Sequence, residues 1–250
     1  MNSRKHGTSS RSRKAAGAGV GVLVVSAAAV VAGTVTVDDV SAAPNPYMGE
    51  DATHTITIDS DGSYLVHIDQ TMELARNYTF TFGGAVHDGF RLPDTESVLP
   101  PYLRAQYSDP AITMDGQPAE VEVEHEVHAV DISAEDKFTE GEHEATVDYR
   151  VTGAAVGSAQ AKTKAQAKAK TGGVAVYFRP LVPGDVVVKS AESIVAVECE
   201  DWPPEGESCG RKSGDDWLIG PDELAETDAV RIIVNTDEAG LIEPRIDSTK

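Results

Sequence analysis

Two histidines with metal-binding potential stand close together in the segment His125-Glu126-Val127-His128. Zinc metalloproteases place two histidines four residues apart on one face of a helix, with a glutamate between them. Here the spacing is three, and the surrounding residues 119–132 alternate between apolar and acidic side chains, which is typical of a strand. Successive strand side chains point to opposite faces, so the two rings cannot share one ion. We therefore reject a zinc protease site here.

Two further patterns could bind a metal. His125 and His143 both fall on inward-facing positions of predicted strands and could pair in space, but no third ligand is apparent, which favours satisfied core histidines. Asp59-Ser60-Asp61-Gly62 resembles the start of a calcium loop, yet the third acidic position and the distal glutamate are missing. A plain turn is favoured, and we predict no metal site.

The remaining catalytic patterns are absent. A carboxylate pair for glycoside hydrolysis cannot be selected from 41 acidic residues. The glycine-containing segment Gly153-Ala154-Ala155-Val156-Gly157 lacks the nucleophile of a serine elbow, and Gly83-Gly84 opens no helix that could hold a phosphate. We predict no catalytic residue and no cofactor.

Short runs rich in valine, isoleucine and threonine, separated by glycine, proline and aspartate turns, predict strands rather than helices. Asp61-Gly62 and Asp115-Gly116 are expected to be turns. The long strand at 119–132 should have one core face and a bulge or bend near Ala129. The predicted strands are residues 53–59, 64–72, 78–82 (ending at Gly83-Gly84), 111–114, 119–132, 142–151, 174–178, 186–189, 193–199 and 229–235, with loop or edge at 94–109 and one short helical turn at 221–227.

These strands predict an all-β fold, an antiparallel β-sandwich preceded by an N-terminal signal or anchor helix. We assign residues 1–42 to a signal peptide or membrane anchor, 43–52 to a linker, 53–238 to the β-sandwich and 239–250 to a tail. A lysine- and alanine-rich repeat at 158–173 is expected to be a solvated insertion, with contact to an anionic wall polymer or an acidic partner as the alternative. Two small β domains divided near this insertion are the second possibility.

The N-terminal leader predicts export. Five basic residues between Arg4 and Lys14 precede an uncharged stretch at 15–37, and Val40 and Ala42 are suitable for signal peptidase cleavage after Ala42. The uncharged stretch is also long enough to be an uncleaved anchor. In both cases the positive cluster stays on the cytoplasmic side, so the rest of the chain is secreted or faces outward from the membrane.

The exported part is strongly acidic. The whole chain carries a formal charge of -20, and its leader is basic. Nucleic acid and anionic lipid are therefore poor partners for its general surface, whereas solubility or attraction of divalent cations are compatible with the charge. Cys199 and Cys209 are the only cysteines, and in an exported chain they predict one structural disulfide.

The segment from Phe80 to Pro93 resembles the most recognisable stretch of a bacterial domain-of-unknown-function family of predicted membrane proteins. Members carry a leader, an outward β domain and usually C-terminal membrane helices. The family's His-Gly-apolar-Arg-apolar-Pro pattern is matched, with Asp88 as one extra residue, by His87, Gly89, Phe90, Arg91, Leu92 and Pro93.

The resemblance covers roughly residues 53–210. Besides the extra Asp88, Ile68 stands where the family usually has an acidic residue. The tryptophan expected near Tyr177 is missing, and the chain stops before any C-terminal membrane helix, so residues 15–37 are expected to be its only anchor. Because the family has no established activity, the resemblance implies no chemistry. His87 and Arg91, beside the Gly83-Gly84 bend, are the candidates for a contact surface; a structural role for Arg91, bonding loop carbonyls, is the alternative.

The leading hypothesis is an exported, non-enzymatic, envelope-associated or secreted interaction module whose partner is an unknown protein or envelope polymer, with membrane contact through the leader if it is uncleaved. A secreted hydrolase that acts on wall polymer with carboxylates from loops such as 94–109 or 200–207 is one alternative. A cation-dependent adhesion module is the other.

We expect cleavage after Ala42 to release a protein that begins at Ala43. N-terminal sequencing of the protein recovered from culture medium and from membranes checks this. An intact Met1 in the membrane fraction would instead show a tethered protein.

Overall fold

The computed structural model describes residues 52–74, 77–87, 89–92, 101–125, 129–157, 173–200, 207–225, 227 and 229–247. The leader, nearly all of the 43–52 linker, the insertion except residue 173, and the last three residues of the tail lie outside the described residues. Within the described part, no helix is both long enough and apolar enough to cross a membrane.

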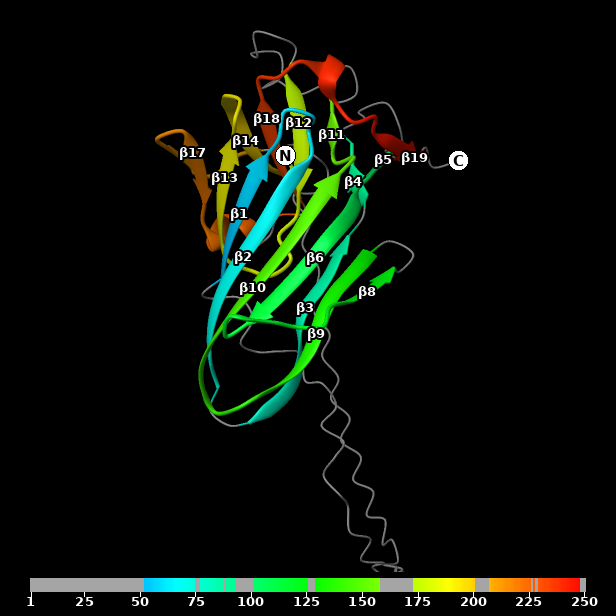
Figure 1. Ribbon diagram of the computed structural model, residues 1–250. Coiled ribbons are helices and arrows are strands. Elements are labelled where there is room, and N and C mark those ends of the chain that lie inside the picture. The colour runs from blue at the N-terminus through cyan, green and yellow to red at the C-terminus, as the bar shows by residue number, and fades with distance from the viewer. Residues whose placement is uncertain are drawn as a thin grey trace, which may run out of the picture. The chain divides into compact units, whose positions relative to one another are not determined.

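The larger sheet has eight strands, and all its pairs are antiparallel except the parallel pair of β1 and β13. Strands before and after the lysine-rich insertion therefore share one sheet. Figure 1 shows the long strands β2, β10 and β6 side by side. In spatial order the strands are β16 (Arg211–Ser213), β17 (Asp216–Ile219), β13 (Asp185–Ser190), β1 (Ala52–Ile58), β2 (Tyr64–Leu74), β10 (Gly141–Thr152), β6 (Gln106–Met114) and β7 (Gln117–Pro118).

A five-stranded antiparallel sheet supplies the second layer, and two three-stranded sheets complete the fold. The five-stranded sheet has the order β11 (Ala155–Val156), β12 (Val174–Phe178), β18 (Ala229–Val234), β14 (Ile194–Glu200) and β15 (Glu207–Ser208). The small sheets are β19 (Arg245–Asp247), β5 (Tyr102–Arg104) and β4 (Gly89–Arg91), and β3 (Tyr78–His87), β9 (Ala129–Phe138) and β8 (Glu122–His125). The described helices are α1 (Pro221–Leu224) and the 3-10 turn η2 (Glu238–Gly240).

The predicted all-β, mainly antiparallel β-sandwich is confirmed. Strand β10 shows why the sequence folds this way: Ala145, Val147, Tyr149 and Val151 are buried, while the residues between them are more exposed. This alternation gives the strand one core face and one solvent face. By contrast, every residue of β12 and β18 is buried, so the five-stranded sheet is covered on both faces at its centre.

Aromatic side chains join the two main layers. Tyr64 of β2 and His54 of β1 each pack edge-on against Phe178 of β12, with ring centroids 6.2 Å apart. The hydroxyl of Tyr64 donates a 2.9 Å hydrogen bond to the carbonyl of Tyr177. On the opposite face of β12 the Tyr177 ring lies 5.8 Å from Phe90 of β4. Strand β12 thus packs between the large sheet and the β4 strand.

Both predicted turns are confirmed. Gly62 has φ +79° between β1 and β2, and Asp61 accepts bonds from the backbone nitrogen and hydroxyl of Ser63. Arg150 donates to Asp59 and to the Ser63 hydroxyl, both at 2.9 Å. The acidic residues of the suspected calcium loop are therefore engaged in holding a turn.

The Asp115-Gly116 turn joins β6 to β7, with φ +49° and +72°. Positive φ at both central residues is the conformation that two-residue hairpins require. The disulfide between Cys199 and Cys209 is also confirmed, and it closes the β14–β15 hairpin.

Three local predictions are wrong. Residues 119–132 form no single strand: β8 and β9 pair antiparallel as a hairpin, and β8 is exposed at every position instead of having a core face. Gly83-Gly84 lies inside β3, so the strand does not end there. Residues 94–109, expected to be loop or edge, contain β5 and the start of β6; β5 lies centrally in its sheet.

A group of charges is buried in the five-stranded sheet, on the face of β12 that carries Tyr177. Arg231 lies on β18, opposite Tyr177 of the neighbouring strand β12 and opposite Glu198 of the other neighbouring strand, β14. Its guanidinium donates to Glu198 at 2.6 and 2.9 Å and pairs with Glu200. The Arg231 and Glu200 side chains each expose only 5% of their surface, so the sheet holds one cation between two carboxylates in a low-dielectric environment.

Removal of the Arg231 guanidinium should strongly destabilise the fold. The change Arg231→Met leaves two buried carboxylates without their cation, and breaking a buried pair in this way costs about 3 to 5 kcal/mol. Urea unfolding measures the loss. Arg150→Gln is the matched control, because the Arg150–Asp59 pair is a third or more exposed and should contribute no more than about 1 kcal/mol. Equal losses in both variants would contradict the expectation.

His54 should make the fold sensitive to acid. The ring is fully buried, its Nδ1 lies 3.3 Å from the carbonyl of Asp185, and its Nε2 has no hydrogen-bond partner among the described residues. Burial lowers the pKa of His54 from 6.5 to about 4. The unfolded chain therefore binds this proton at higher pH than the folded chain. Above pH 6.5 this titration does not lower the free energy of unfolding. As the pH falls from 6.5 to about 4, the free energy of unfolding decreases by about 3 kcal/mol in total.

His54→Leu removes this titration, so its free energy of unfolding should fall less than that of the natural chain between pH 7 and pH 4. Urea unfolding at several pH values measures both curves. Parallel curves would show that folding does not change the pKa of His54.

Candidate functional site

Arg91, predicted to belong to a contact surface, lies in β4 at one edge of the three-stranded sheet with β5 and β19. It stands opposite Tyr102, which stands opposite Asp247. Two residues farther along β5, Arg104 stands opposite Arg245 of β19. Residues directly opposite each other, or two apart on one strand, share a face of the sheet. We call these five residues the arginine face.

Hydrogen bonds and ring contacts order the arginine face. The Nε of Arg91 donates to the Tyr102 hydroxyl at 2.9 Å. The guanidinium carbons of Arg91 and Arg104 lie 5.9 and 6.0 Å from the centre of the Tyr102 ring, within cation–π distance. The bond to Tyr102 goes to a side chain. A structural role for Arg91, bonding loop carbonyls, stays an alternative prediction.

Asp247 connects the other two arginines. Its Oδ2 accepts from Arg104 Nε at 2.9 Å, and its Oδ1 lies 3.6 Å from Arg245 Nε. Gly89, which stands opposite Arg104, leaves room for this arrangement: a Cβ there would lie 3.4 Å from Arg104 Nη1 and 3.3 Å from the Tyr102 ring. The other face of the sheet carries Phe90 and Leu103, which are buried. The apolar side anchors the sheet and the polar side is left for contact.

The charge of the arginine face opposes that of the chain. Three guanidiniums against one carboxylate make it net positive, although the chain carries a formal charge of -20. The Arg104 side chain exposes 19% of its surface, and the Arg245 side chain exposes 72%. Arginine presents several N–H donors in a planar fork that suits carboxylates and phosphates. The arginine face is therefore a candidate anion-binding surface.

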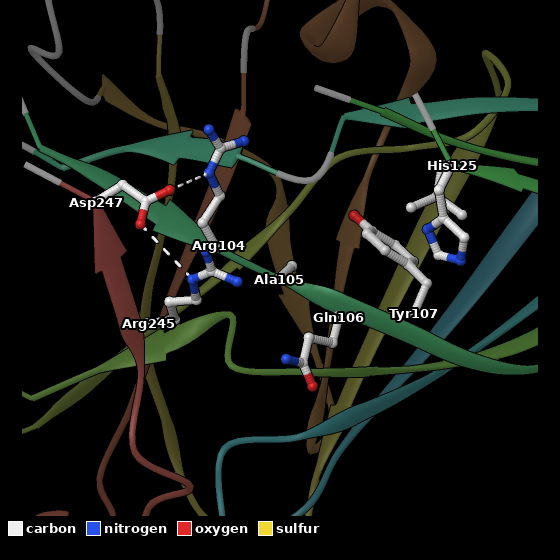
Figure 2. Close-up of a pocket in the computed structure, with 8 residues that line it drawn as sticks. Arg104, Ala105, Gln106, Tyr107, His125, Arg245 and Asp247 are labelled. Atoms are coloured by element: carbon white, nitrogen blue, oxygen red, sulfur yellow. Dashed lines mark hydrogen bonds and ion pairs between the residues drawn. The ribbon is translucent and has the colours of Figure 1, made fainter. Parts of the chain in front are cut away.

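A pocket of about 510 Å³ adjoins the arginine face. Figure 2 shows Arg104, Arg245 and Asp247 on one side of it and Tyr107 and His125 on the other. The full described lining is Arg104, Ala105, Gln106, Tyr107, His125, Val130, Arg245 and Asp247. Strands β5, β6, β8, β9 and β19 all contribute, so the pocket exists only where three of the sheets meet.

His125 and His143, whose pairing was the disfavoured alternative to satisfied core histidines, lie on different strands in different sheets. His125 is exposed on β8 and lines the pocket. His143 is buried on β10, where its Nδ1 bonds to Asp115 at 2.8 Å and its Nε2 to the carbonyl of Thr139 at 2.9 Å. The bond to Asp115 raises the pKa of His143. The expectation of a satisfied core histidine is thus confirmed for His143 and wrong for His125.

His87, the other predicted contact residue, ends β3, and its backbone pairs with Ala129 of β9. Its side chain lies outside the described residues, as do Glu126 and His128. Among the residues that the structure describes, no group of three or more histidine, cysteine, aspartate or glutamate side chains could hold a metal ion.

The buried charges around Arg231 include one carboxyl with unusual acidity. Burial raises the pKa of Glu200 to about 7, despite the contact with Arg231. A carboxyl that titrates near neutral pH has the acidity of a general acid or base, which requires access to a substrate. Glu200 is 4% exposed and does not line the described pocket, so we assign the cluster a structural role.

Sequence reasoning identified Arg91 but missed Arg104, Arg245, Gln106 and Asp247. The available signal was the polar–apolar–polar pattern of Tyr102-Leu103-Arg104 and Arg245-Ile246-Asp247, which is the alternation of a strand. Leu103 is buried as this alternation predicts, whereas Ile246 is exposed. Each segment has only three residues, too few to separate this pattern from chance.

The chain matches no protein-family model and no curated protein, so the resemblance to a domain-of-unknown-function family stays a prediction. Solved structures that resemble it include a candidate nutrient binding protein from Legionella pneumophila, with 10% identity and a TM-score of 0.44 over 75% of this chain and 66% of that one. Leukotriene A4 hydrolase from Saccharomyces cerevisiae has 8% identity and a TM-score of 0.40 over 75% and 29%. An M1 zinc metallopeptidase from Deinococcus radiodurans has 11% identity and a TM-score of 0.37 over 75% and 42%.

The chain spans less than two thirds of the length of each of these three proteins. Identities and TM-scores at this level do not establish a shared fold or activity, and no argument below rests on them.

Proposed function

We propose that this protein is an exported interaction module without enzymatic activity, secreted or held at the outer face of the membrane, and that it contacts an anionic envelope polymer through the arginine face. The observation that carries the proposal is the gathering of Arg91, Arg104 and Arg245 on one face of a small sheet in a strongly acidic chain. A positive area on an acidic protein directs anionic partners to one place and repels them elsewhere.

The geometry of the arginine face suits reversible contact. Its ion pairs with Asp247 are partly exposed, and exposed ion pairs exchange partners at little cost in free energy. Tyr102, held between two guanidiniums, keeps their side chains oriented. Acidic groups of the polymer would form further ion pairs with these arginines. Nucleic acid is a poor candidate, because most of the surface carries the same sign of charge as phosphate.

Two observations support an interaction module over the alternatives. The described lining of the pocket includes one carboxylate, Asp247, whereas wall-polymer hydrolysis by paired carboxylates needs two. Both ring nitrogens of His143 are engaged, with Asp115 and with the carbonyl of Thr139, so the His143–Asp115 pair has no ring nitrogen left to activate a nucleophile. The hydrolase and the cation-dependent adhesion module stay alternative predictions.

Export is supported by the basic and uncharged composition of the leader and by the Cys199–Cys209 disulfide. Disulfides form and persist mainly in oxidising compartments such as the cell exterior.

Loss of the arginine face should strongly weaken binding to polyanions. The test measures retention of the full-length protein on immobilised poly-L-glutamate, a probe of negative charge alone. The triple variant R91Q/R104Q/R245Q should bind roughly tenfold more weakly or worse, since each lost charge contact contributes up to about 1 kcal/mol. The control K189Q/R211Q/K212Q removes three exposed cations from the large sheet and changes the net charge equally.

Retention that falls equally in both triple variants would show that only net charge matters, which contradicts the proposal. Absence of retention for the natural chain would contradict it as well. Thermal unfolding of each variant separates lost binding from lost folding.

A further inference from the structure

We infer that the pocket beside the arginine face binds a single acidic sugar of the uronate type, with its carboxylate on Arg245 and its hydroxyl groups on Gln106 and His125. This inference deepens the proposed function and rests on it, because it names the chemical unit of the polymer that the site recognises.

The pocket has the size of a small-molecule site. Its volume of about 510 Å³ falls within the roughly 300 to 1,000 Å³ typical of ligand pockets. An ion or one water molecule needs far less, since a water occupies about 30 Å³ in the liquid. The lining also includes Gln106, His125 and Arg245, whose side chains are exposed, so one unit of a chain could enter the pocket from outside.

Arg245 is positioned to bind a carboxylate. Its side chain is 72% exposed, and its one ion pair joins Nε to Asp247 at 3.6 Å. The terminal nitrogens of its guanidinium have no partner in the described part of the chain. Asp247 itself shows that a planar carboxylate fits against these arginines, because its Oδ2 pairs with Arg104 and its Oδ1 pairs with Arg245. A ligand carboxylate would use the remaining edge of Arg245.

The fixed charges of the lining favour one negative charge on the ligand. Among the lining residues that the structure describes, two guanidiniums and one carboxylate leave a single net positive charge. A uronate carries one negative charge, which this balance neutralises. A phosphate monoester carries nearly two, and Asp247 would repel the second. The lining therefore selects a singly charged carboxylate over a phosphate monoester.

The rest of the lining suits a sugar ring. The side chains of Gln106 and His125 have no hydrogen-bond partner among the described residues, and each offers both a donor and an acceptor to hydroxyl groups. Tyr107 presents an aromatic ring held 5.8 Å from Tyr149. Ala105 and Val130 add apolar contact for the non-polar face of the ring. Polar groups at one side and apolar surface at another match the two kinds of surface of a sugar.

Isothermal titration calorimetry of the full-length protein with D-glucuronate, D-glucose and D-glucose 6-phosphate tests the inference at neutral pH. Glucuronate should bind about tenfold or more tightly than glucose, the factor expected for one charge-assisted contact. It should also bind more tightly than glucose 6-phosphate. Glucose that binds as well as glucuronate would overturn the role of Arg245. Glucose 6-phosphate that binds equally or better would overturn the choice of a carboxylate.

Variants locate the binding. R245Q should weaken glucuronate binding by about tenfold or more, and Q106A should weaken both glucuronate and glucose, because it removes a contact to hydroxyl groups. R211Q, an exposed arginine on β16, is the control and should leave the affinity unchanged. Equal affinities for the natural chain, R245Q and Q106A would overturn the inference, provided that thermal unfolding shows folded variants.

The two proposals fail in different ways. Retention on poly-L-glutamate without glucuronate binding would overturn the sugar pocket and leave the arginine face standing. Glucuronate binding with retention unaffected by R91Q/R104Q/R245Q would overturn the arginine face as the polymer contact.

Discussion

The position of β12 between two layers is the constraint on which the rest of the structure depends. One face of β12 presents Phe178 to Tyr64 and His54 of the large sheet, and the other presents Tyr177 to Phe90 of β4. Phe90 in turn precedes Arg91 on the same strand. Because neighbouring strand residues point to opposite faces, burial of Phe90 against Tyr177 forces Arg91 outward. The core packing thus determines the direction of the arginine face.

The same constraint explains how an acidic chain distributes its few cations. Arg231 lies beside Tyr177 on the covered face of β18 and holds two glutamates in a dry environment, where loss of one partner would leave an uncompensated charge. Arg104 and Arg245 share one aspartate in a partly exposed environment. Solvent makes the second arrangement weaker and open to exchange. Burial therefore separates an arginine that stabilises the fold from arginines that can bind a partner.

The polarity of the pocket follows from how its walls are built. Strand β19 is a short edge of its small sheet, β5 is a short strand at the centre of that sheet, and β8 is exposed at every position, so polar side chains are tolerated at all three. Where these strands meet β6, the half-buried Tyr107 brings an aromatic ring from the margin of the core. The pocket is consequently polar on one side and aromatic on the other.

Much of the fold was predictable because its signals are local. Alternation in β10 and the Asp61-Gly62 and Asp115-Gly116 turns depend on neighbours in sequence, and all three are present. Prediction failed where local signals misled. The apolar alternation from Ala119 continues up to the start of β9 with no glycine or proline to mark a turn, so one strand was expected where two pair. The short strands β5 and β19 carry too little pattern to be identified.

The sequence by itself determined the all-β class, the turns, the disulfide partners and Arg91 as a residue of interest, because periodicity, turn propensity and the presence of only two cysteines operate within the chain. The tertiary structure alone decided that Arg104 lies against Asp247, 143 residues away, and that Gln106, His125 and Arg245 line one pocket. The physical reason is that strand order and sheet packing are set by the burial of surfaces between distant segments. No pattern within any one of those segments records which other segment will cover it.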